Sequence, residues 1–266
     1  MAKTTQRGLA ALPFALVLAC VTSPLGRTQL RIFPETQMAE MGVAAYDKLK
    51  TETPRSRDLR AIGTVRCVAD ALTAELSGPA ARIDWEVTVF ADPAANAFAL
   101  PGGKIGVFTG LLSVARSQDQ LATVMGHEVS HVVAGHANER VSTAYATQTG
   151  LDYIATLSGK SSPAQKQLIA ILGAGAQFGI VLPFSRAQER EADLLGLDLM
   201  AKAGFDPEQS IQLWRNMAQA GGAQPPEFLS THPSHHTRID ELASRMPHAR
   251  ALQDQARAQG KRPNCS

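Results

Sequence analysis

Residues 121–136 read LATVMGHEVSHVVAGH, and this stretch decides how the rest of the chain must be arranged. On a helix, residues four apart lie on one face, so His127 and His131 can direct their imidazoles at one point. Glu128 lies one residue further along, close enough to act on whatever the histidines hold. The pattern His-Glu-x-x-His supplies two zinc ligands and a carboxylate that can accept a proton from water. The alternative is a helix that carries two histidines by accident.

The segments before this stretch predict a small sheet beside a central helix. Ser117 can cap the helix that carries the motif, and apolar residues on most of its sides predict burial across the middle of a domain. Residues 83–89 alternate apolar and polar side chains, which is typical of a half-buried strand. Residues 104–109 predict another strand, reached through a hairpin that turns at Pro101-Gly102-Gly103. The predicted fold class is α+β, helix-rich with a small sheet.

Helices are predicted on both sides of this core. Apolar spacing predicts helices at residues 35–50 and 57–76 on the N-terminal side. On the C-terminal side, helices are predicted at residues 188–202, 207–217 and 237–246. A further run, residues 168–184, carries no charge. It could dip into a membrane, but its length, glycines and interruptions favour a buried or cleft-covering helix.

Length and composition predict one globular domain with tails, because 266 residues at 44% hydrophobic content can bury a core. The formal net charge is +2 and no dense Lys/Arg cluster stands out, so nucleic acid is not an expected partner. We predict a signal peptide at residues 1–19, a lipid-anchored tether and first helix at 20–53, the main domain at 54–248 and a loose polar tail at 249–266.

The first twenty residues resemble an export signal. Lys3 and Arg7 precede an uncharged, mostly apolar run that is short for a membrane span but suits a signal-peptide core. The sequence VLAC at residues 17–20 resembles a bacterial lipobox, so we predict lipidation of Cys20. Ordinary cleavage near Ala19, with a free or disulfide-bonded Cys20, is the alternative.

If Cys20 carries lipid, Cys67 and Cys265 remain as an even pair in an oxidising compartment. We predict that they form a disulfide, which would hold the C-terminal tail to an early helix. Two unrelated thiols are the alternative.

The motif helix leaves the third metal ligand open, since a catalytic zinc needs three protein ligands. His136 lies five residues past His131, about 140° around the same helix, and is expected to point elsewhere. Glu189 and Asp193 lie four apart on a predicted helix, so one can bind metal while the other orients a ligating histidine. Glu191 falls on the opposite face of that helix and is expected to be a surface charge.

Four motifs in order carry a resemblance to a known family. They are NAFA at residues 96–99, GVFTGLL at 106–112, LAxVxGHExxH at 121–131 and SRxxExEAD at 185–193. Over roughly residues 55–245 the chain resembles zinc metallopeptidases of the HtpX and CAAX-prenyl-protease type, and within them the soluble periplasmic, BepA-like and LoiP-like branch. The resemblance implies a zincin-like domain with one Zn²⁺ on His127, His131 and Glu189, Glu128 as catalytic base, and Asp193 behind a ligand.

Two further segments gain roles from the resemblance. The strand of Asn96, Ala97, Phe98 and Ala99 is expected along the cleft, where an extended substrate would pair with its free edge; an ordinary core hairpin is the alternative. Residues 231–238, THPSHHTR, are similar to a His-Pro segment near the family's cleft. We hypothesise that His232 approaches the zinc as a fourth ligand or supports the oxyanion, and that Arg238 pairs with a carboxylate. The alternative is a surface loop with solvated histidines.

Together these patterns predict a zinc metalloendopeptidase that cleaves misfolded or stalled cell-envelope proteins. The expected location is the periplasmic face of an outer membrane, because no aspartate follows Cys20 to retain it at the inner membrane. Expected partners are unfolded envelope proteins, the membrane through the lipid anchor, and the outer-membrane assembly machinery. Two alternatives are a largely latent chaperone or assembly factor, and a structural zinc protein. Glu128 argues against the latter, since a structural site needs no base.

Overall fold

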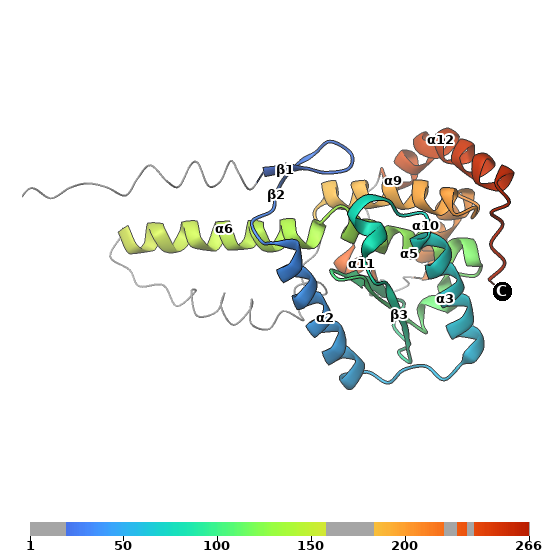
Figure 1. Cartoon of the computed structure of the whole chain (residues 1–266), viewed down its shortest axis with the longest axis horizontal. Helices are drawn as coiled ribbons and strands as arrows, with labels where there is room; N and C mark the ends of the chain where they lie inside the picture. The colour runs from blue at the N-terminus through green and yellow to red at the C-terminus, as the bar shows by residue number, and fades with distance from the viewer. Residues whose placement is uncertain (1–19, 158–183, 221–227, 233–236, 266) are drawn as a thin grey trace, which may run out of the picture.

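The computed structural model describes residues 20–157, 184–220, 228–232 and 237–265. Most of them lie in helices around a small sheet, which confirms the predicted α+β class (Figure 1). The helices are α2 (Glu35–Glu52), α3 (Leu59–Thr73), α4 (Leu111–Val114), α5 (Gln118–Val133), α6 (His136–Leu157), α9 (Arg186–Lys202), α10 (Glu208–Ala220), α11 (Phe228–Thr231) and α12 (Arg238–Ala258).

The main sheet holds three strands in the order β3-β5-β4, with β3 at Glu86–Phe90, β4 at Ala97–Leu100 and β5 at Lys104–Phe108. Strand β5 is parallel to β3 and antiparallel to β4, and the predicted hairpin turn between β4 and β5 is confirmed. Gly102 and Gly103 both adopt positive φ, which glycine tolerates without strain. The first predicted strand begins late, because the 3₁₀ helix η1 (Gly78–Arg82) is followed by a turn held by a hydrogen bond from Trp85 Nε1 to Ala80 O, 3.2 Å long.

The two faces of this sheet bury different side chains. On one face an aromatic cluster packs against α2, and it consists of Tyr46, Phe90, Phe98 and Phe108. On the other face, aliphatic side chains such as Ile105 and Val107 join the main core with α3 and α5. The sheet is therefore covered on both faces, and α5 lies directly beside β4.

Helix α5 crosses the middle of the domain and packs against α3, α9 and α10 as well as β4 (Figure 1). Ser117 caps it as predicted, since its Oγ accepts a hydrogen bond from the backbone of Gln120. Helices α5 and α9 come closest where Gly126 faces Gly196. A Cβ atom built on Gly196 would lie 2.8 Å from the backbone nitrogen of His127, so no side chain fits there without moving a helix.

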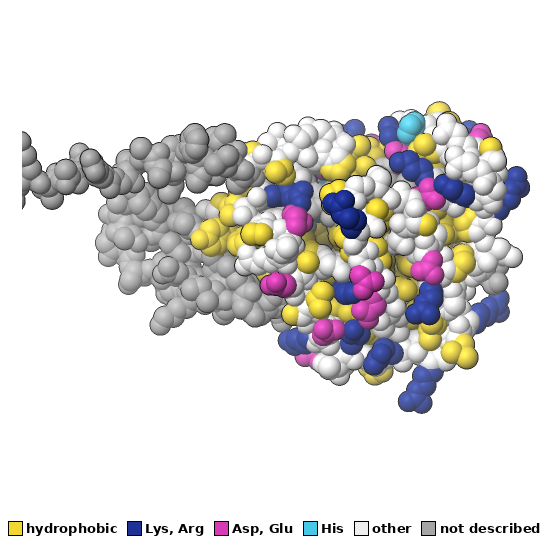
Figure 2. Space-filling model, viewed as in Figure 1, with side chains coloured by type: hydrophobic (Ala, Val, Ile, Leu, Met, Phe, Trp, Pro, Cys, Tyr) yellow, Lys and Arg dark blue, Asp and Glu magenta, His cyan; other side chains and the backbone are white. Residues whose placement is uncertain are grey.

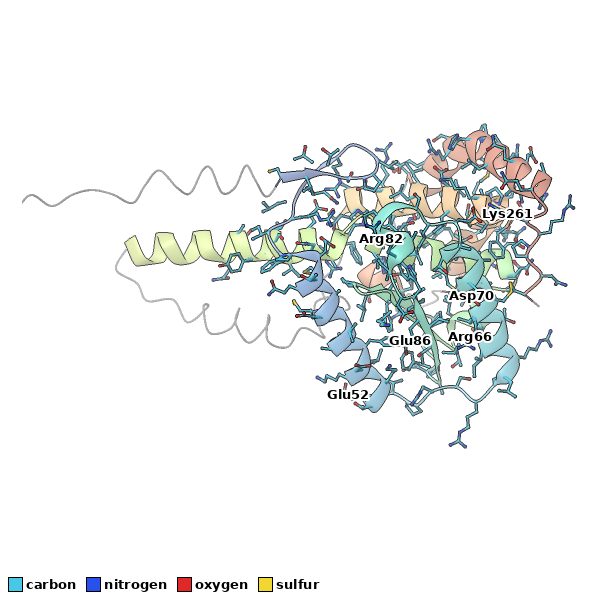
Figure 3. All side chains as sticks on the ribbon, in the orientation of Figure 1. Glu52, Arg66, Asp70, Arg82, Glu86 and Lys261 are labelled. Carbon is cyan, nitrogen blue, oxygen red and sulfur yellow. A yellow bond between two sulfur atoms is a disulfide. The ribbon has the colours of Figure 1, made fainter. Side chains whose placement is uncertain are left out.

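The C-terminal end of the chain is more ordered than predicted. Helix α12 continues to Ala258, so the prediction of a helix ending at residue 246 and a loose tail after 249 is wrong. The small side chains of Ala249 and Ala256 are buried, which a search for large apolar residues overlooks. Beyond α12 the chain runs beside α3, where Lys261 binds Glu75 and the structure contains the disulfide between Cys67 and Cys265 (Figure 3).

The N-terminal end also departs from the prediction of a simple tether. Strands β1 (Cys20–Thr22) and β2 (Thr28–Leu30) form an antiparallel hairpin that lies over the start of α6 (Figure 1). Gln29 is buried there, and its side chain donates to Ala134 O at the end of α5. We call residues 20–30 the N-terminal hairpin.

The surface of the described residues mixes side chains of both charges, and the charge-free run lies almost entirely outside them. Acidic and basic side chains are interspersed over the face shown in Figure 2. The run at residues 168–184 lies outside the described residues except for Phe184. Among the helices that are described, none is both long and apolar enough to cross a membrane.

Candidate metal centre

The two histidines of the central motif converge as their spacing predicts. Both lie on one face of α5, both are buried, and their Nε2 atoms are 3.0 Å apart. Burial lowers the pKa of His131 well below its ordinary value, which favours the neutral imidazole that binds metals. The motif helix therefore presents two nitrogen donors at one point inside the domain.

Glu189 reaches the same point from α9. A capping box between Ser185 and Gln188 fixes the start of this helix, so Glu189 falls in its first turn. Its carboxylate oxygens lie 3.5 Å from His127 Nε2 and 3.4 Å from His131 Nε2. Burial alone would raise the pKa of Glu189, but the neighbouring histidines outweigh it and hold that pKa far below its usual range. The carboxyl group is therefore the charged form that a cation requires.

These three groups fit a zinc ion. Ligands that lie 2.0–2.1 Å from a tetrahedral zinc are about 3.3 Å from one another. The donor separations of 3.0, 3.4 and 3.5 Å bracket that value. Two imidazoles and one carboxylate are also the donor types that zinc prefers. The chemistry and the spacing of the donors thus agree on the same ion.

Asp193 lies behind the donors, where the sequence places it. Its Oδ1 is 2.9 Å from His127 Nδ1, so Asp193 can orient the imidazole through the nitrogen that faces away from the donors. Arg238 pairs with carboxylates as predicted: its Nε donates to Asp193 Oδ2 at 2.6 Å and its Nη2 to Glu189 Oε2. The guanidinium also stacks 3.9 Å above the ring of Trp214. One buried arginine therefore steadies both acidic groups.

The prediction for Glu191 is wrong, whereas His136 lies outside the donor group as predicted. Glu191 is 4% exposed rather than a surface charge, and its Oε2 lies 3.1 Å from His136 Nε2. His136 stays outside the donor group, but its Nδ1 is 2.8 Å from His131 Nδ1. The contact with Glu191 was missed because α5 ends at Val133 and Gly135 turns the chain with a positive φ, so His136 begins a new helix. Ala134-Gly135, just before His136, was the sequence signal that the helix ends there.

His232 is buried rather than solvated, which excludes the surface-loop alternative for this residue. Its Nδ1 lies 2.9 Å from Glu189 Oε1 and 3.2 Å from His127 Nε2, so four potential donors come within 4.8 Å of one another. Its ring is stacked between Phe228 and Phe184, with centroids 4.4 and 4.9 Å away. His235 and His236 lie outside the described residues.

Glu128 sits beside the donors without joining them. Its side chain is buried, and burial raises its pKa against the attraction of His232 and His127. Its Oε1 lies 3.3 Å from His232 Nε2, yet within the described part of the chain this oxygen accepts no hydrogen bond. A buried carboxylate in this position can take up a proton.

A helix-borne His-Glu-x-x-His motif joined by a carboxylate from a second helix defines a zincin-like metallopeptidase domain. The chain belongs to peptidase family M48, whose model matches residues 60–246.

Several relatives carry the same domain. The mitochondrial metalloendopeptidase OMA1 of Schizosaccharomyces pombe is 40% identical over 174 residues, or 65% of this chain and 50% of that protein. The beta-barrel assembly-enhancing protease of Yersinia pestis is 31% identical over 56% of this chain and 32% of its own length. The metalloprotease YcaL of Escherichia coli is 26% identical over 67% of each chain. This chain spans about half the length of the mitochondrial relatives it matches.

Proposed function

We propose that this chain is a zinc-dependent endopeptidase in which His127, His131 and Glu189 hold the ion and Glu128 is the general base. The observation that carries the proposal is the placement of Glu128, a buried carboxylate of raised pKa directly beside a donor set that fits zinc. A purely structural zinc site needs no such group. When bound, zinc supplies a Lewis acid that polarises a carbonyl oxygen and acidifies water.

Three residues of the chain have separate roles in the proposed reaction. Glu128 accepts the proton of the attacking water and passes it to the leaving amine, as a general base and then a general acid. Asp193 keeps the proton on His127 Nδ1, so that Nε2 of the same ring is free to bind the ion. Arg238 holds Glu189 and Asp193 in place through charge-assisted hydrogen bonds.

The free edge of β4 is the proposed substrate platform. Among the described residues, strand β4 pairs with β5 on one side and with no strand on the other, as the sheet order shows. Phe108 donates to Asn96 O across that pair, so the alternation of antiparallel bonding turns the backbone groups of Ala97 and Ala99 towards the other edge. A backbone hydrogen bond from Ala99 reaches Glu128. An extended peptide added along this edge would pass directly over the base.

A cavity of about 290 Å³ supports the same placement. It lies beyond the end of β4, bounded by the Pro101-Gly102 turn, and reaches His131. Met38, Ile83 and Val132 contribute apolar surface to its walls. We expect it to receive an apolar side chain of the substrate.

We further propose that the substrates are misfolded or stalled cell-envelope proteins, met on the periplasmic face of an outer membrane to which lipid on Cys20 anchors the chain. The lipobox-like residues 17–20 support the anchor. The name of the beta-barrel assembly-enhancing protease supports the envelope setting and a link to the assembly machinery. The mitochondrial relatives support the peptidase class alone.

The position of His232 supports a second candidate, a largely latent chaperone or assembly factor. With Nδ1 among the donors, His232 would act as a fourth ligand and leave no open position for substrate. Removal of this histidine should then raise the rate of cleavage.

The test is cleavage of casein by the zinc-loaded mature protein, with Glu128→Gln beside it. Cleavage by the wild type alone would support both the protease and its base. Equal cleavage by both would contradict the role of Glu128. If neither cleaves although both hold one zinc, His232→Ala decides: a gain of cleavage supports latency, and continued inactivity contradicts the endopeptidase.

A further inference from the structure

We infer that the N-terminal hairpin is part of the metal centre, because Arg27, Glu191 and His136 form a line of positioning residues that ends on His131. The inference rests on the proposed function, since it takes His131 as a ligand. It adds an element of the fold, more than 100 residues away in sequence, that controls how firmly the ion is held.

The hairpin is bound to the domain by polar contacts from several of its residues, among them a hydrogen bond between the Ser23 side chain and Glu191. Arg27 donates through Nε to Glu191 Oε2 at 3.2 Å and through Nη2 to Glu139 Oε2 at 2.6 Å. The backbone nitrogen of Leu25 donates to Glu191 Oε1 at 3.1 Å. Gln29 donates to Glu139 Oε2 at 3.2 Å as well as to the end of α5. Both oxygens of Glu191 are therefore held by the hairpin.

The remaining contacts lead from Glu191 to the ligand. His136 Nε2 is 3.1 Å from Glu191 Oε2, and His136 Nδ1 is 2.8 Å from His131 Nδ1. His136 is 0% exposed, so water does not compete for either nitrogen. The line is continuous from the hairpin to the ligand.

The direction of the protons along this line is fixed by chemistry. For His131 to bind a cation through Nε2, its Nδ1 must carry the hydrogen and donate it. His136 must then accept at Nδ1 and carry its own hydrogen on Nε2, where the Glu191 carboxylate is the acceptor. Arg27 and the Leu25 amide donate to that carboxylate in turn. Every donor meets an acceptor, and the tautomer that the ligand needs is the one that this line selects.

The two ligand histidines are thus oriented in different ways. Asp193 contacts His127 directly, whereas the carboxylate that serves His131 acts through a second imidazole. Groups that orient metal-binding histidines typically change metal affinity 10- to 100-fold when they are removed. We therefore expect His136 to matter as much to zinc binding as Asp193 does.

Two substitutions of His136 separate positioning from packing. His136→Asn retains an acceptor near the place of Nδ1 but not the contact with Glu191, whereas His136→Gln retains a donor near Nε2 but not the contact with His131. The measurement is the zinc dissociation constant of the mature protein, by competition with a chelator of known affinity. We expect affinity to fall about 10- to 100-fold in the Gln variant and less than about fivefold in the Asn variant.

The melting temperatures of the metal-free variants show how far each substitution destabilises the fold. A purely structural role would weaken zinc binding equally in both variants, in step with their melting temperatures, and that result would overturn the inference. So would wild-type affinity in both. If neither variant folds, Arg27→Met replaces them: we expect its zinc affinity to fall several-fold, and unchanged affinity would overturn the inference.

Asp198→Asn is the matched control. Asp198 lies on α9 like Glu191 and pairs with Arg245 at 2.6 Å, but this pair does not lead to a ligand. Its loss should lower the melting temperature and leave zinc affinity unchanged; an equal fall in affinity would show that any lost ion pair on α9 loosens the site, against the inference. Failure of the wild type to bind zinc would instead refute the proposed function, so the two failures are distinguishable.

Discussion

An N-terminal and a C-terminal segment of the described chain each bring one arginine to the surroundings of the donor cluster. Arg238, at the start of α12, is 2% exposed and contacts Glu189 and Asp193 directly. Arg27, in the N-terminal hairpin, has a side chain 27% exposed and acts through Glu191 and His136. The C-terminal end is also fixed by the disulfide between Cys67 and Cys265, whereas the N-terminal end is held by hydrogen bonds and ion pairs.

The difference in burial between Arg238 and Arg27 predicts that the first matters more for the stability of the fold and that the second can exchange its contacts more easily. A fully buried arginine between two buried carboxylates cannot leave without exposing both of them to an apolar interior. A partly exposed arginine on a short hairpin can exchange its contacts with water at lower cost. The comparison therefore predicts a graded series of effects along the chain.

The largest effect is expected for Arg238→Met. We expect the free energy of unfolding of the metal-free protein to fall by about 3–5 kcal/mol, because Glu189 and Asp193 would keep their buried charge without its partner. Urea unfolding followed by circular dichroism measures this free energy. The value for Arg238→Lys should lie between those of the wild type and of Arg238→Met. A loss below about 1 kcal/mol would contradict the assigned role of Arg238.

The disulfide should come next. The Cys67→Ser/Cys265→Ser double variant is expected to lose about 2–5 kcal/mol, since the bond restrains the unfolded chain over a sequence separation of 198. Zinc affinity should stay unchanged, because the bond joins α3 to the C-terminal tail rather than to a ligand. The matched control is the wild type with and without reducing agent; equal urea midpoints would show that the bond does not contribute.

Arg27→Met should show a smaller loss of stability with a distinct effect on the site. We expect about 1.5–3 kcal/mol, the usual range for hydrogen bonds to charged groups, together with a several-fold loss of zinc affinity. The disulfide variant, in contrast, is expected to lose more stability while its zinc affinity stays unchanged. If Arg27→Met left affinity intact while the disulfide variant lost it, the comparison of the two ends would be wrong.

The smallest effect is expected for Arg250→Ala on the outer face of α12. Its partner is Glu208, and the two side chains are 61% and 41% exposed, so solvent and salt screen the pair. We expect a change of about 0.5 kcal/mol or less in the same urea titration. A larger loss would mean that α12 itself, rather than Arg238, limits the stability of the domain.

Local patterns in the sequence were sufficient for the parts of the site that one helix or one turn defines. The four-residue spacing of His127 and His131, the Ser117 cap and the turn at Gly102-Gly103 all depend on neighbours within a few residues. Their geometry follows from the regular structure of a helix or a hairpin. Such features could therefore be predicted before any fold was known.

The missed parts depend on contacts between distant segments. Arg27 meets Glu139 and Glu191, which lie 112 and 164 residues away, and no periodic pattern marks these pairs. The contacts of His136 were missed for a different reason, because one ideal helix was extended past Gly135, where the chain turns. Helix α12 was cut short because its buried side chains beyond Met246 are Ala249, Gln253 and Ala256 rather than large apolar residues.

The close approach of Gly126 and Gly196 has a consequence for the spacing of the donors. Helix α5 carries His127 and helix α9 carries Glu189, so the contact between these backbones sets the distance between the nitrogen and oxygen donors. A methyl group at position 196 would push the helices apart and enlarge the space between the donors. Two residues without side chains thus set how closely the imidazole of one helix and the carboxylate of the other can approach the same ion.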